Sequence, residues 1–178
     1  MDRPHGFGDC LAPSVEPWDV YRTRGGSAGR VSYRQLEQLR QIRQEFSASK
    51  AALDYLAVKW PEWQREHRSA DLTMSHVRAA AEDVEATYTV RVFSSFEAML
   101  RDFLPLGRIT TTGRRSVYDL INRTASRLRI PADIRDDVHR LREYRNQAVH
   151  RGGSPPPRVL FPQALATLNR FVAWLPNP

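Results

Sequence analysis

Hydrophobic positions along residues 31–103 recur at steps of three and four, the spacing that places side chains on one face of a helix. The first series begins after Ser32, which forms a capping-box pattern with Gln35. Its seam positions are Leu39, Ile42, Phe46, Ser49, Leu53, Leu56 and Trp60. Pro61 is expected to end or kink this long helix, with residues 63–70 as a polar connection.

A second long helix is predicted to start near Ser75 and to end before Pro105 and Gly107. Its apolar stripe consists of Val77, Ala81, Val84, Tyr88, Val92, Phe96, Met99 and Phe103. Residues 105–113 are expected to form a loop.

Three shorter helices are predicted in the rest of the chain. The first covers residues 115–129, and its seam positions are Val117, Leu120, Ile121, Thr124 and Leu128. The next has Pro131 in its first turn and runs to Gly152 and Gly153, the residues that stop it. The last opens at Pro162, ends at Pro176, and has seam positions Leu165, Leu168, Val172 and Leu175.

No segment shows the alternation of a strand bounded by hairpin turns. We therefore expect an all-α fold, an up-and-down helical bundle of about five helices, two long and three shorter. The short links 129–131 and 152–161 should place the helices that they join antiparallel. Residues 31–175 would form this single domain, with residues 176–178 as a C-terminal tail. Residues 1–30 are rich in glycine and proline without periodicity, which predicts a flexible or loosely docked N-terminal arm.

Charge favours a polyanionic partner. The net charge is +7 and the sequence pI is near 10.2, with nearly all of the positive charge on arginine, because only Lys50 and Lys59 are lysines. Arginine can fork two hydrogen bonds onto a phosphate. Genomic base composition would also enrich arginine, so charge alone leaves both interpretations open.

Location and cofactors are constrained by what the sequence lacks. A single cysteine, Cys10, cannot form an internal disulfide, and neither a secretory signal nor an apolar run of about 20 residues is present. We expect a cytoplasmic protein with no membrane span. No dinucleotide, P-loop, zinc or serine-hydrolase motif occurs, so we expect no cofactor and no metal.

The fourth predicted helix has a charged residue within its apolar stripe. Ile134, Val138, Leu141 and Val149, with Ala148 beside them, form the stripe, and Arg145 falls in its middle. Burying an unpaired guanidinium costs on the order of several kcal/mol, because the charge loses its hydration. Arg145 therefore has either a buried acidic partner or a polar cleft in front of it.

Asn146 and His150 are four residues apart and lie on the same side of this helix. His150 is in the last turn, where the helix dipole favours the imidazolium form. An ideal helix places Arg145 and His150 roughly 140° apart, so convergence on one ligand requires unwinding toward the glycines. His139 has the wrong spacing from Arg135 and is expected to be a solvated surface residue.

The segment Arg145-Asn146-Gln147-Ala148-Val149-His150 resembles the R-polar-x3-H signature of the HEPN superfamily (higher eukaryotes and prokaryotes nucleotide-binding). In that family the motif lies late in a helix of a small all-α bundle. Residues 91–104, RVFSSFEAMLRDFL, are similar to the long helix that carries an aromatic-rich dimer face and an acidic residue, here Glu97. The resemblance implies a metal-independent RNA endonuclease that works as a homodimer, with two motifs facing each other across a cleft between protomers.

The resemblance also implies roles for these residues. The 2′-hydroxyl of the RNA attacks the adjacent phosphate and leaves a 2′,3′-cyclic phosphate. His150 would transfer protons, Arg145 would bind the phosphoryl oxygens, and Asn146 would orient His150 or hold the phosphate. Glu97 would pair with Arg145, support catalysis, or be exposed.

A toxin or defence role, with an antitoxin or regulatory protein as a partner, is a further implication. One toxin subset has R-x4-H-x-Y, whose tyrosine is modified by a partner nucleotidyltransferase, but this chain has Gly152 there. Silencing by that route is therefore not expected. The alternatives are a non-catalytic HEPN-like module that binds RNA or a protein partner, and a basic helical scaffold with a buried Arg145–Glu97 pair.

Overall fold

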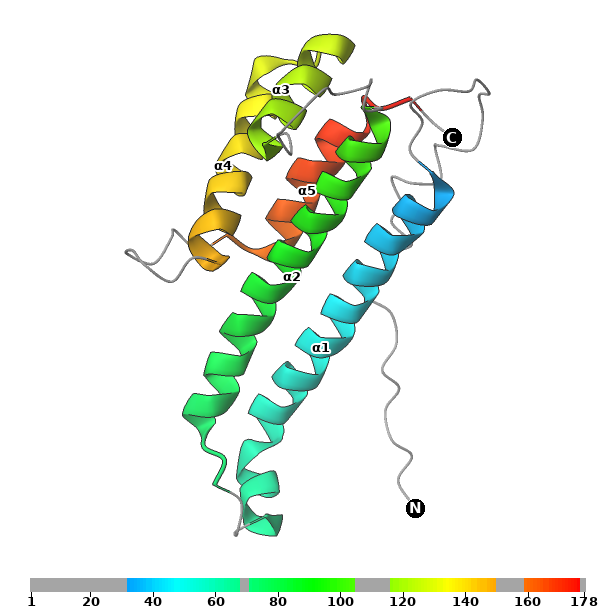
Figure 1. Ribbon diagram of the computed structural model, residues 1–178. Coiled ribbons are helices and arrows are strands. Elements are labelled where there is room, and N and C mark those ends of the chain that lie inside the picture. Colours follow the sequence, from blue (N-terminus) through cyan, green and yellow to red (C-terminus); the bar gives the residue numbers. More distant parts are fainter. Residues whose placement is uncertain (1–31, 68–70, 105–115, 150–158, 177–178) are drawn as a thin grey trace.

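Five helices and no strand make up the residues that the computed structural model describes, which are 32–67, 71–104, 116–149 and 159–176 (Figure 1). The helices are α1 (Tyr33–Glu66), α2 (Met74–Phe103), α3 (Val117–Leu128), α4 (Ala132–Val149) and α5 (Phe161–Val172). The prediction of an all-helical fold with two long and three shorter helices is confirmed. The expected arm 1–30 and loop 105–113 lie outside the described residues. Among the helices described, none has the length and apolarity needed to cross a membrane.

Helix α1 begins at the predicted cap but continues past Pro61. The Ser32 side chain accepts a hydrogen bond from the Gln35 N–H at 3.3 Å, which completes the capping box. The prediction that residues 63–70 form a connection is wrong for Trp63–Glu66, which are helical. Stacking of Trp63 on Trp60 at 5.1 Å and on His67 at 4.5 Å stabilises this last turn, and offsets the hydrogen bond that Pro61 cannot donate.

Helices α1 and α2 form a long antiparallel hairpin (Figure 1). Gln35, near the start of α1, donates to Asp102 at the end of α2 at 2.6 Å. Further along, Ser49 and Tyr88 are hydrogen-bonded at 3.2 Å. The start of α1 thus contacts the end of α2, and the middles of the two helices contact each other, as expected for an antiparallel pair.

One hydrophobic cluster joins all five helices, and phenylalanine rings occupy its centre. Its largest fully buried aromatic side chains are Phe93, Phe96, Phe103, Phe161 and Phe171. Phe96 of α2 meets Phe171 of α5 edge to face at 5.4 Å, the arrangement that the ring quadrupoles favour. Phe46 of α1 packs against Phe161 at 4.3 Å. The core therefore places α5 beside α2, and the first residue of α5 also contacts α1.

The helices do not alternate strictly in direction. Both α3 and α5 run antiparallel to α4, as the short links predicted, but α2 runs antiparallel to α4 as well, so α2 and α3 point the same way (Figure 1). This is a departure from a simple up-and-down order. Residues 105–115 separate α2 from α3, and a segment of that length can span the roughly 18 Å of a 12-residue helix.

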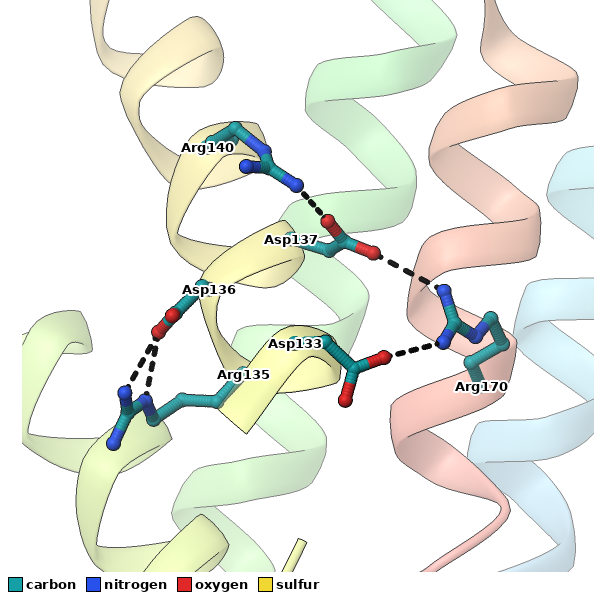
Figure 2. A network of polar contacts seen from close by, with 6 residues as sticks. All are labelled: Asp133, Arg135, Asp136, Asp137, Arg140 and Arg170. Carbon is teal, nitrogen blue, oxygen red and sulfur yellow. Dashed lines mark hydrogen bonds and ion pairs between the residues drawn. The ribbon is translucent and has the colours of Figure 1, made fainter. Parts of the chain in front are cut away.

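An ion-pair network joins the end of α5 to the start of α4 (Figure 2). Arg170 contacts Asp133 at 2.9 Å and Asp137 at 3.1 Å, and Asp137 also pairs with Arg140. The Arg170 side chain is 53% exposed, so solvent screens these pairs and each contributes about 1 kcal/mol or less. The network sets the register of the two helices more than it stabilises them.

The start of α5 is capped from another helix. Leu160 precedes the helix and offers no side-chain acceptor, but the Phe161 N–H donates to a carboxylate oxygen of Glu85 on α2 at 2.8 Å. Glu85 is only 7% exposed. A carboxylate at this position satisfies a backbone donor and complements the helix dipole.

Replacing Glu85 with leucine should destabilise the protein, because the buried Phe161 N–H loses its acceptor. We expect a loss of about 1–3 kcal/mol, or about 2–4 °C in Tm per kcal/mol for a chain of this size. Thermal unfolding followed by circular dichroism measures it. Glu82→Leu, an exposed change on the same helix, is the control and should shift stability by less than about 0.5 kcal/mol. Equal stability of the two variants would contradict this role for Glu85.

Candidate functional site

The buried face of α4 differs from the predicted stripe at its C-terminal end. Ile134, Val138, Leu141 and Tyr144 are buried, whereas Val149 is 48% exposed. The prediction that Val149 belongs to the apolar stripe is therefore wrong. Tyr144 replaces it in the core, so the buried face turns away from Arg145 in the last turns. Arg145 lies on the flank of this face, with its side chain 27% exposed.

A carboxylate on α2 is the charge partner of Arg145. The Nη2 atom of Arg145 lies 3.8 Å from Oε2 of Glu97, whose side chain is 16% exposed. The other oxygen of Glu97 contacts Arg101 one turn further along α2 at 2.5 Å. Of the three alternatives for Glu97, the structure shows the pairing with Arg145. These three side chains together carry one net positive charge.

Arg145 also contacts its neighbour in the sequence. Its Nη1 donates to Oδ1 of Asn146 at 3.1 Å, while its Nε is buried without a partner in the described part of the chain. The Glu97 contact is too long for a strong hydrogen bond. Within the described residues, the Arg145 Nη atoms make no other hydrogen bond and the amide N–H groups of Asn146 make none, whereas the Arg145 Nε is buried from solvent.

The remaining part of the predicted site is outside the described residues. The description of α4 stops at Val149, so His150, Gly152 and Gly153 are not placed. The structure brings Arg145, Asn146 and Glu97 together. Convergence of His150 on the same ligand stays a prediction.

His139 is not the solvated residue that its spacing predicted. It lies half-buried between α3 and α4, where Nε2 is 3.1 Å from Oδ1 of Asn122 and the ring packs on Tyr118 at 4.6 Å. Burial lowers the pKa of His139, and the positive charges of Arg142 and Arg135 lower that pKa further. The prediction failed because it considered α4 alone, whereas α3 covers this side of the helix.

A groove between α4 and α5 was not predicted from the sequence. Its volume is about 500 Å³. Polar residues that line it include Asp137, Arg140, Glu143, Gln147, Gln163 and Thr167. Arg145, Asn146 and Glu97 are not among its lining residues. Within the residues described, no group of three or more His, Cys, Asp or Glu side chains is arranged to hold a metal ion.

Comparison with family models, with curated proteins and with solved structures gave no match to this chain.

Replacing Arg145 with alanine should have a moderate effect on stability. The pair is long and partly exposed, and Glu97 keeps its contact with Arg101, so we expect a loss of about 1–2 kcal/mol, between the values of exposed and buried pairs. This corresponds to a fall in Tm of about 2–8 °C. Arg78→Ala, an exposed change on α2, is the matched control. A loss above about 3 kcal/mol would show that the Arg145–Glu97 pair is chiefly a structural element.

Proposed function

We propose that this protein is a HEPN-like, metal-independent RNA endonuclease. The observation that carries the proposal is the setting of Arg145. Glu97 contacts it from α2, Asn146 contacts it on α4, and within the described residues its Nη atoms make no other hydrogen bond. This setting occurs within the R-N-x3-H sequence that resembles the family motif.

The proposed reaction is a transesterification within the RNA. The 2′-oxygen forms a bond to the adjacent phosphorus as the bond from phosphorus to the 5′-oxygen breaks. The products are a 2′,3′-cyclic phosphate and a 5′-hydroxyl. A base must take the proton of the 2′-hydroxyl, and an acid must give a proton to the 5′-oxygen. Each transfer is typically worth about 10²–10⁴-fold in rate.

Arg145 would stabilise the charge that develops on the phosphoryl oxygens. A guanidinium can donate two parallel hydrogen bonds to a phosphate, and one held in place beforehand needs no reorganisation during the reaction. Glu97 acts in this scheme as a positioning residue, because it contacts Arg145 and not the RNA. The Asn146 amide oxygen accepts from Arg145, and its N–H groups, which make no hydrogen bond within the described residues, would donate to the phosphate.

A homodimer would supply the second proton-transfer group. Each chain offers one candidate, His150, whereas the reaction uses both an acid and a base. A two-fold axis that brings two copies of His150 together provides both from one sequence. The same proposal includes a cytoplasmic toxin or defence role, controlled by an antitoxin or regulatory protein.

The second candidate is a non-catalytic HEPN-like module that binds RNA or a protein partner. The Arg145–Glu97 pair favours it, because a partly buried ion pair between α2 and α4 has a structural role of its own. Cleavage assays separate the two candidates.

Purified protein should cleave RNA in the presence of EDTA and leave 2′,3′-cyclic phosphate ends. His150→Ala should lower the rate by about 10²-fold or more, because proton transfer is lost. Arg145→Ala should lower it by about 10²–10³-fold through lost charge stabilisation. Product ends are identified by mass spectrometry.

His67→Ala and Arg78→Ala are the matched controls, since both residues are exposed and lie outside the proposed site. They should retain the parent rate. Absence of cleavage by the parent protein across structured and single-stranded RNAs would leave only the non-catalytic candidate. Equal cleavage by the parent and His150→Ala would place the activity elsewhere.

Activity should also depend on dimerisation. Analytical ultracentrifugation gives the dissociation constant of the dimer, and the rate per chain should fall when the protein is diluted below it. A constant rate per chain in a strictly monomeric sample would contradict the composite site and would show that a single chain cleaves RNA.

A further inference from the structure

A polar ridge on α4 leads away from the Arg145–Asn146 pair. His139, Arg142 and Asn146 have the spacing i, i+3, i+7, which places them on one face of the helix. The ridge is about 10 Å long at 1.5 Å per residue. Arg142 and Asn146 are one turn apart, so their side chains are neighbours. The motif that resembles an RNase site is one end of a longer polar surface.

An aromatic ring on α3 lies at the other end of this ridge. Tyr118 is 50% exposed. The imidazole of His139 packs on its ring at 4.6 Å and the guanidinium of Arg142 lies 5.0 Å from its centroid. Both contacts come from α4, and the residue keeps half of its surface exposed beside them. Such a ring, fixed by a cation and an imidazole, is a preorganised surface for stacking.

The charge at this end of the ridge is weakly neutralised. The Arg142 side chain is 19% exposed, and its acidic contact within the described residues is Glu143 at 3.3 Å, which is 61% exposed. Solvent screens a pair of this kind. Arg142 Nε is buried and has no hydrogen-bond partner among the described residues. Burial is the main cause of the lowered pKa of His139. The positive charges of Arg142 and Arg135 lower this pKa further.

We propose that Tyr118 and Arg142 form a subsite for one unpaired nucleotide, with the base stacked on the Tyr118 ring and the phosphate paired with Arg142. An aromatic ring beside a weakly neutralised arginine matches the two parts of a nucleotide, a π-face and an anion. An acidic peptide would use the arginine but not the exposed aromatic surface of Tyr118. The subsite rests on the proposed function only in that the bound strand would be the substrate of the Arg145–Asn146 site one turn away. Binding itself needs no catalysis.

Binding is measured with fluorescent 2′-O-methyl RNA hexamers of adenosine and of uridine, which lack the attacking hydroxyl and cannot be cleaved. Anisotropy gives Kd for the parent, Tyr118→Leu, Tyr118→Phe and Arg142→Gln proteins. We expect Tyr118→Leu to weaken binding by about 5- to 100-fold, the effect of losing one base stack, while Tyr118→Phe retains affinity. Arg142→Gln should weaken both hexamers and reduce the salt dependence by about one phosphate contact.

Tyr55→Leu is the matched control, because Tyr55 is an exposed tyrosine on α1, 68% exposed, away from the ridge. It should bind as the parent does. An abasic ribose-phosphate hexamer provides a second control, since it should bind the parent and Tyr118→Leu equally. All measurements are made well below the melting temperature of each variant, and circular dichroism verifies folding.

Parent-like affinity of Tyr118→Leu for both hexamers would overturn the proposal, as would failure of both hexamers to bind the parent protein. If replacing Tyr118 disturbed the fold, both the leucine and the phenylalanine variants would bind RNA more weakly. A loss of stacking would weaken binding in the leucine variant alone. Tyr118-dependent binding without cleavage in EDTA would keep the subsite and refute the endonuclease. Cleavage in EDTA, with binding that does not depend on Tyr118, would keep the endonuclease and refute the subsite.

Discussion

Helix α2 is the element on which the rest of the fold depends, because it packs against each of the other four helices. Its second half is apolar on several sides, and Val92, Phe93, Phe96 and Leu100 are fully buried. Two carboxylates of α2, one before this apolar part and one within it, each contact another helix. Glu85 caps the start of α5 and Glu97 holds Arg145 of α4. The long helix thus supplies both the hydrophobic burial and the polar contacts that fix its neighbours.

The Arg145–Glu97 contact links the fold to the proposed site. One carboxylate facing two arginines neutralises only half of their charge, and at 3.8 Å its attraction biases the Arg145 guanidinium toward α2. An arginine directed into solvent alone would lose side-chain entropy when it bound a phosphate. Holding Arg145 from a second helix reduces that loss. A role in stability and a role in anion binding are therefore compatible for this residue.

The sequence predicted what local periodicity determines and missed what neighbouring helices determine. Steps of three and four predicted all five helices, since one face of each is buried. Periodicity could not show that the core takes Tyr144 in place of Val149, because both positions border the same stripe. It also could not show that α3 covers His139, or that stacked tryptophans carry α1 past Pro61. Arg145 was identified because a charge in an apolar stripe is visible from α4 alone, and its partner Glu97 because the family resemblance pointed to that helix.

The unequal lengths of α3 and α4 explain where the polar ridge becomes accessible. The two run antiparallel, α3 has 12 residues and α4 has 18, so about 9 Å of α4 extends beyond the helix that covers its first turns. Tyr118 lies in the first turn of α3, at the boundary of the covered part, and Arg142 reaches its ring from α4. Arg145 and Asn146 follow in the turns that α3 does not cover. A strand that places a phosphate at Arg145 and continues along the ridge toward the start of α4 would therefore meet the Tyr118 ring, which makes the end of α3 part of the surface on which the proposed chemistry depends.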